Sequence, residues 1–105
     1  RAGAFLFLSG QIALDTKTMT VVEGDVAAQA EQVLKNMKGA LESQGLDFSD
    51  VVKTTVFIKD MNDFGKINEI YGKSFTKDAP ARSCVEVARL PKDVLIEIEA
   101  IALLK

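Results

Sequence analysis

The fold is decided by Val51-Val52-Lys53-Thr54-Thr55-Val56-Phe57-Ile58, a stretch near the middle of the 105-residue chain. Its β-branched side chains are stiff and favour extended backbone, so the stretch predicts a strand. A helical pattern precedes it over residues 25–44, and a second one follows over residues 62–75. A strand between two helices indicates a mixed fold, and the length suits one domain, residues 1–105.

The helix before this strand carries signals at both ends. Asp25 is a favourable N-cap residue, and Gly45 followed by the apolar Leu46 is typical of a Schellman cap. Gly39 lies within the helix, where we expect it to permit close packing on a sheet. The apolar stripe of this helix consists of Val26, Ala30, Val33, Leu34, Met37 and Leu41. The second helix directs Phe64, Ile67, Tyr71 and Phe75 inward.

The segments outside the helices predict further strands. Ala4–Leu8 is a continuous apolar run, which favours a strand buried on both faces, and Ser9-Gly10-Gln11 predicts a bulge before Ile12–Leu14. The other predicted strands are Met19–Val22, Arg82–Ala88 and Val94–Leu103.

The predicted order is therefore strand, strand, helix, strand, helix, strand, strand. This order indicates an α+β fold, with one mostly antiparallel or mixed sheet and both helices on one face. Leu95, Ile101 and Leu103, or their neighbours, leave apolar groups on the other face. We therefore expect self-association, with sites at the seams between subunits.

Composition excludes several classes of chemistry. The chain has no histidine, which removes histidine-based zinc sites, triads and proton shuttles. Its one cysteine excludes an internal disulfide or a cysteine-built metal site and fits a reducing compartment. The net charge of −2 argues against a duplex nucleic-acid binder. No apolar run approaches the roughly 20 residues of a membrane span.

Arg82 is the first candidate for function. It opens a strand on which Arg82, Cys84 and Glu86 share one face. If the last two strands form a hairpin, Arg82 opposes Glu99 and Cys84 opposes Glu97, which would create a polar strip. A one-residue slip would move both carboxylates to the other face. Spacing alone favours a salt bridge from Arg82 to one of these glutamates over a bound carboxylate ligand.

The other candidates each have two interpretations. Glu97 is either a proton carrier that positions water or a paired structural carboxylate. Cys84 is either a nucleophile or an inert thiol, and the lack of a histidine to activate it favours the second. Ser9 and Gly10 either offer donors to an anion or form only a bulge. Asn68 either lines a pocket or bonds to backbone, and we expect the backbone bond.

Several short motifs occur together and in order. The chain thereby resembles the reactive intermediate deaminase family, also called RidA or YjgF, over essentially all of its length. The motifs are Leu8-Ser9-Gly10-Gln11-Ile12, Val51-Val52-Lys53-Thr54-Thr55-Val56, Asn68-Glu69-Ile70-Tyr71, Pro80-Ala81-Arg82-Ser83, Arg89-Leu90-Pro91-Lys92 and Ile96-Glu97-Ile98-Glu99-Ala100-Ile101-Ala102.

The resemblance implies a chorismate mutase-like fold and a homotrimer whose sheets close into a barrel, with sites at the seams. The implied activity is hydrolysis of enamines and imines such as 2-aminoacrylate to a 2-oxo acid and ammonia, without cofactor or metal. Arg82 would grip the substrate carboxylate and Glu97 would assist the attacking water. Ser9, Asn68 and Cys84 would line the site. Family members also carry an upstream Gly-Pro-Tyr-Ser-like segment whose tyrosine lines the site, and this chain starts after it.

Two other functions remain open on the sequence. The same residues suit a non-catalytic binder of 2-oxo or other short carboxylic acids. An RNA-directed role, as translation inhibitor or ribonuclease, is described for some relatives, but the net charge and the lack of histidine argue against it. We expect a cytoplasmic protein, or an organellar one if a targeting segment precedes Arg1.

Overall fold

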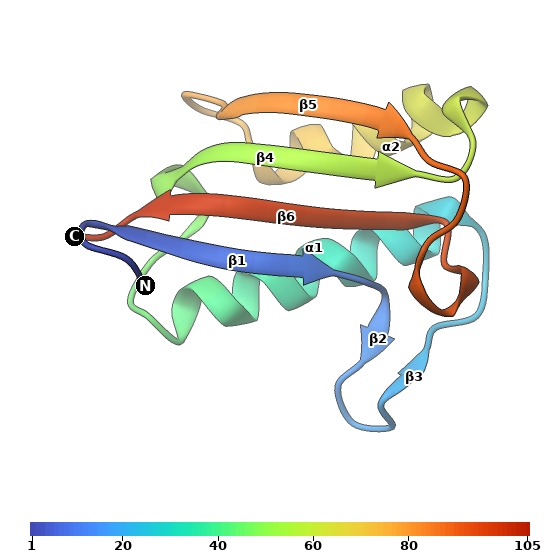
Figure 1. Cartoon of the computed structure of the whole chain (residues 1–105), viewed down its shortest axis with the longest axis horizontal. Coiled ribbons are helices and arrows are strands. Elements are labelled where there is room, and N and C mark those ends of the chain that lie inside the picture. Colours follow the sequence, from blue (N-terminus) through green and yellow to red (C-terminus); the bar gives the residue numbers. More distant parts are fainter.

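The structure is a computed structural model that describes residues 1–105. A four-stranded sheet lies in front of two helices (Figure 1). Short 3-10 turns occur at Phe48–Asp50, Met61–Asp63 and Pro91–Asp93. The elements are β1 Phe5–Gln11, β2 Leu14–Asp15, β3 Thr20–Val21, α1 Val26–Glu42, β4 Val51–Ile58, α2 Phe64–Ser74, β5 Ala81–Glu86 and β6 Ile96–Leu103. The α+β class and the placement of both helices on one face are confirmed.

The strand order in the sheet is β1-β6-β4-β5. β6 is antiparallel to both of its neighbours, whereas β4 and β5 are parallel. The predicted hairpin between the last two strands is therefore wrong, because β4 lies between them. The physical reason is the connection through α2, since a strand–helix–strand unit returns the chain parallel to its start.

The prediction of a single sheet is also wrong in one detail. The segment predicted as a strand at Met19–Val22 supplies β3, which pairs only with β2 in a separate two-stranded ribbon. Asn36 of α1 fixes this ribbon, because its Nδ2 donates to the carbonyl oxygen of Leu14 at 2.9 Å. The predicted bulge is confirmed, since the β1–β6 register shifts between Leu8 and Gln11.

The predicted ends of α1 are confirmed. The backbone N–H of Ala28 donates to Asp25 Oδ1 at 3.1 Å, which satisfies one free amide of the first turn. At the other end, Gly45 has a φ of +73°. The N–H of Leu46 donates to the Leu41 carbonyl at 2.9 Å, and that of Gly45 donates to Glu42 at 3.0 Å, as in a Schellman motif.

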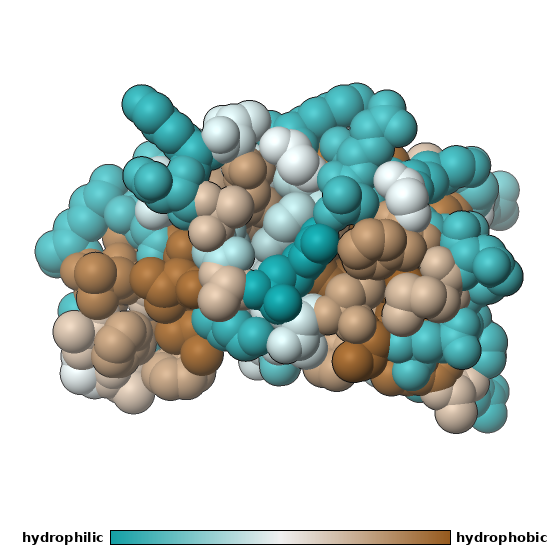
Figure 2. Space-filling model, turned by 90° about the horizontal axis from the view of Figure 1, so that it is seen from above, coloured by the Kyte–Doolittle hydropathy of each residue, from teal (hydrophilic) through white to brown (hydrophobic).

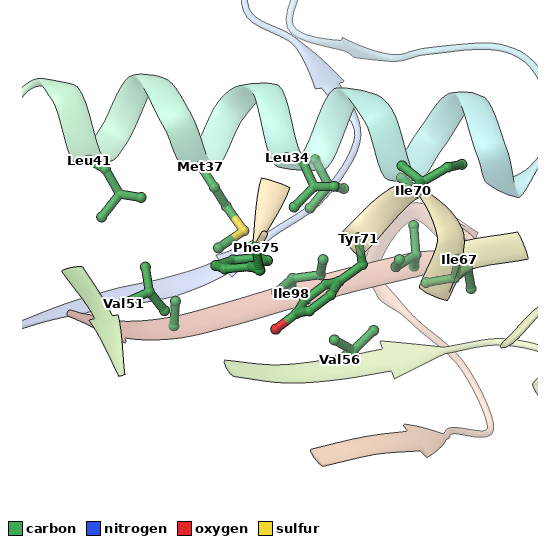
Figure 3. Packing of buried hydrophobic residues seen from close by; sticks show 14 of the residues in the cluster. Leu34, Met37, Leu41, Val51, Val56, Ile67, Ile70, Tyr71, Phe75 and Ile98 are labelled. Carbon is green, nitrogen blue, oxygen red and sulfur yellow. The ribbon is translucent and has the colours of Figure 1, made fainter. Parts of the chain in front are cut away.

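One core joins the helices to the sheet. Met37 and Leu41 of α1 are fully buried, and Ile98 of β6 is 1% exposed. Figure 3 shows Leu34, Met37 and Leu41 directed from α1 toward the strands, with Tyr71 of α2 and Phe75 just after it packed among them. Each large apolar side chain buried in this way stabilises the fold by about 1.5–3 kcal/mol.

Gly39 does not have the role that the sequence suggested. It is exposed, and nothing lies within 4 Å of the position where a Cβ would be. The helix therefore lies on the sheet through its other residues. Since Gly39 also has no positive φ, its backbone is ordinary helix.

Replacing Gly39 by alanine is therefore expected to raise the free energy of unfolding by about 0.5–1 kcal/mol, because alanine loses less backbone entropy in a helix. Urea denaturation measures this. Gly45→Ala is the matched control and should destabilise, because its φ of +73° disfavours a side chain. If Gly39→Ala lost stability, the space around residue 39 could not be as open as the structure shows.

The sheet face opposite the helices, here called the open face, carries several apolar side chains. Phe7 is 57% exposed, so the prediction that Ala4–Leu8 is buried on both faces is wrong for a single chain. Leu95, expected on this face, packs instead against the core. In the view from above, hydrophobic residues form separate patches between hydrophilic ones (Figure 2). The apolar residues of the open face are Phe5, Phe7, Phe57, Val85, Ile101 and Leu103.

Neither helix is both long and apolar enough to cross a membrane.

Candidate functional site

Arg82 lies on β5, on the sheet face that the helices cover. Its strand partner is Thr54 of β4, and the side chain runs toward α2. Arg82 Nη1 donates to Asn68 Oδ1 at 2.7 Å. Its Cζ lies 4.8 Å from the centre of the Tyr71 ring and 5.4 Å from that of the Phe64 ring. The guanidinium is therefore held by one amide and two aromatic rings.

No carboxylate pairs with Arg82. The salt bridges of the chain join Lys66 to Asp25, Arg89 to Asp93 and Lys105 to Asp50. The expected salt bridge to Glu97 or Glu99 is wrong, because those side chains lie on the open face of the sheet. Arg82 is half-buried and its one polar partner is neutral. Most of its N–H donors therefore remain free to bind an anion.

A pocket of about 370 Å³ opens beside the guanidinium. We call it the Arg82 pocket, and its walls are both polar and apolar. Asn68 is exposed and bonds to Arg82 instead of to backbone, contrary to our expectation. The residues that line the pocket are Asn68, Tyr71, Gly72, Phe75, Ala79, Pro80 and Arg82. A cation at one end of a partly apolar hollow suits a small organic anion.

Cys84 follows two residues after Arg82 on the same face and is half-buried. Burial raises the pKa of its thiol, and the nearby positive charge of Arg82 opposes this shift only in part. The thiol therefore remains protonated at neutral pH, which does not favour a nucleophile. Cys84 packs against the hydrophobic core and is not among the residues that line the Arg82 pocket.

Glu97 and Gly10 form a second group on the open face. A Cβ on Gly10 would overlap the Glu97 carboxylate, so the missing side chain is what allows this close approach. Gly10 lies in the bulge of β1, next to the exposed Ser9. We call Ser9, Gly10 and Glu97 the Gly10–Glu97 corner. It places a carboxylate beside irregular backbone, as sites for small polar ligands often require.

The structure thus gathers the candidate residues into two groups and separates the groups. Arg82, Asn68 and Cys84 lie on the helix-covered face, whereas Glu97 projects from the open face. Because successive strand residues alternate between faces, the sheet itself stands between Arg82 and Glu97. Within one chain, the two groups cannot contact the same small molecule.

The aromatic surroundings of Arg82 were not predicted from the sequence. Phe64 and Tyr71 were predicted as inward residues of the second helix, without any role toward the arginine. Their spacing with Asn68 was the available signal, since positions 64, 68 and 71 lie on one helix face. The face is evident from the sequence, but its contact with β5 depends on the parallel pairing of β4 and β5.

Comparison with known proteins identifies the family. Residues 1–104 match the family model described as Endoribonuclease L-PSP. The chain is 58% identical to 2-iminobutanoate/2-iminopropanoate deaminase of Salmonella typhimurium, over 95% of this chain and 80% of that protein. The chain belongs to the RidA family. A relative from Pyrococcus horikoshii, named RutC family protein PH0854, is also 58% identical, over 97% of this chain and 81% of its own length.

A solved structure of the RidA family supports the fold. Escherichia coli TdcF with bound serine matches 100% of this chain and 84% of its own, with a TM-score of 0.93 and 46% identity. The predicted membership in the RidA family and the fold that it implied are therefore confirmed. The names of these two relatives differ. The Salmonella protein is named as an imine deaminase, whereas PH0854 carries only a family name.

Proposed function

We propose that this protein hydrolyses small 2-imino acids, and the enamines that tautomerise to them, to 2-oxo acids and ammonia. The observation that carries the proposal is the half-buried Arg82, whose polar partner is a neutral amide beside a pocket of about 370 Å³. A carboxylate is the natural ligand for the free edge of a guanidinium. The deaminase name of the Salmonella relative supports the choice of substrate.

In the proposed reaction, Arg82 holds the substrate carboxylate and water attacks the imine carbon. A C–O bond forms, the C=N electron pair moves to nitrogen, and protonation gives a carbinolamine. The carbinolamine then loses ammonia as the C=O bond forms. Holding the substrate near one water contributes mainly through proximity, and a carboxylate such as Glu97 can accept the proton of that water.

Glu97 can take this role only if a second copy of the chain supplies it. We propose a homotrimer in which the open faces pack together and the Gly10–Glu97 corner of one copy lies at the Arg82 pocket of the next. The exposed apolar side chains of the open face, such as Phe7 and Leu103, support this assembly. Ser9 and Gly10 would then line the site beside Glu97.

The proposal is tested by generating 2-aminoacrylate in situ and following ammonia and 2-oxo acid release. The purified protein should accelerate both equally, because each hydrolysed imine yields one of each. Titration with 2-oxobutanoate, a stable carboxylate analogue, should show saturable binding. Binding without any acceleration would indicate a carboxylate-binding protein instead of an enzyme.

The family description also names an endoribonuclease. The absence of histidine and the net charge of −2 favour imine hydrolysis over RNA cleavage. An RNA substrate belongs in the same assay. Cleavage that persists through repeated purification and is lost in Arg82 variants would contradict the proposed substrate.

A further inference from the structure

Two aromatic rings lie close to the Arg82 guanidinium. Its Cζ is 4.8 Å from the centre of the Tyr71 ring and 5.4 Å from that of the Phe64 ring. Both rings come from the α2 face that also provides Asn68, which accepts the one hydrogen bond from Arg82 Nη1. Cation–π contacts do not use up N–H donors, so the donors that Asn68 does not accept remain available to a carboxylate.

Tyr71 is itself fixed by contacts in the core. Its hydroxyl is 2.7 Å from Thr54 Oγ1, and Thr54 has no exposed surface. The Phe75 ring stacks on it, with centroids 4.5 Å apart and planes at 30°. Burial raises the pKa of the phenol above its usual value, so the hydroxyl stays neutral and available for this bond. The Tyr71 ring cannot shift without breaking a buried hydrogen bond, which is costly.

We propose that Phe64 and Tyr71, with Tyr71 anchored by Thr54, are positioning residues that hold the Arg82 guanidinium in one orientation before substrate arrives. A free arginine side chain samples many rotamers, and a ligand that must order it binds more weakly. The two rings restrict this motion in advance. Their effect on catalysis rests on the proposed function, but the ordering of the guanidinium does not.

Phe64→Leu tests the proposal, because Phe64 is half-buried and lies outside the hydrophobic core, so its replacement leaves the core intact. From the strength of cation–π contacts, we expect the Kd for 2-oxobutanoate and the KM for the imine to rise about 3- to 30-fold, with a smaller change in kcat. Phe64→Tyr keeps a ring and should restore both values. Phe48→Leu is the matched control, since the Phe48 ring contacts Phe75 and is not one of the two rings that contact Arg82.

A measurement without substrate separates this proposal from the proposed function. NMR relaxation of the Arg82 Nε–H should show an ordered side chain in the parent protein and in Phe64→Tyr, and a mobile one in Phe64→Leu. Equal order in all three would overturn the positioning role, whatever the activity. Preserved order with no imine hydrolysis by the parent protein would instead overturn the proposed function and leave the positioning role of Phe64 and Tyr71 in place.

Discussion

Arg82→Met is expected to remove nearly all acceleration of imine hydrolysis. Removing one partner of a desolvated charge pair costs about 2–5 kcal/mol, so kcat/KM should fall by about 30- to 5,000-fold. Arg82→Lys should recover little, because an ammonium group offers no planar fork to a carboxylate. Steady-state kinetics on 2-iminopropanoate generated in situ provides the measurement.

Arg89→Met is the matched control for this change. Arg89 is an exposed arginine in a surface salt bridge with Asp93, at 2.7 Å, and such pairs contribute little. The kcat/KM of the Arg89→Met protein should equal that of the parent protein. If Arg82→Met retained full activity while remaining folded, Arg82 could not be the carboxylate anchor.

Placing a charge on the open face is expected to separate the subunits and to abolish activity. Phe7 is 57% exposed and opposes Ile101 across β1 and β6. Phe7→Glu would bury a carboxylate if this face packs against another copy, and an unpaired buried charge is strongly unfavourable. Sedimentation should then show a species of one chain, 11.4 kDa, that keeps its secondary structure but no longer accelerates the reaction.

Met19→Glu is the control, because Met19 is 64% exposed but lies in the turn between β2 and β3, away from the open face. It should leave both assembly and activity unchanged. A Phe7→Glu protein that is a single chain and fully active would show that one chain carries the whole site.

Local features of the fold could be predicted from the sequence, because local physics determines them. The bounds of β4 match the predicted strand at Val51–Ile58, and the caps at Asp25 and Gly45 lie where their chemistry requires. The alternation of side chains along a strand predicts which face of the sheet each residue occupies, but it does not predict which strands are neighbours. The pairing of the last strands could therefore not be predicted from it. The strand–helix–strand order around α2 was the overlooked signal for parallel pairing.

The strand face of Arg82 was predicted correctly, but the expected glutamate partner was wrong. The alternation after Pro80 placed Arg82 and Cys84 on one face, which the structure confirms. The carboxylates were misplaced because their position depended on the hairpin. Correcting the topology changes the interpretation, because Arg82 has no acidic partner within the chain and Glu97 lies beyond the sheet.

The central claim is that one site takes Arg82 from one copy and Glu97 from another. Mixing two inactive variants, Arg82→Met and Glu97→Gln, after partial unfolding and joint refolding tests it directly. Random assembly of equal amounts would leave about one quarter of the seams with both native residues. We predict that the mixture regains about that fraction of parent activity, while each variant alone stays inactive. A mixture that forms mixed oligomers by native mass spectrometry but remains inactive would contradict the claim.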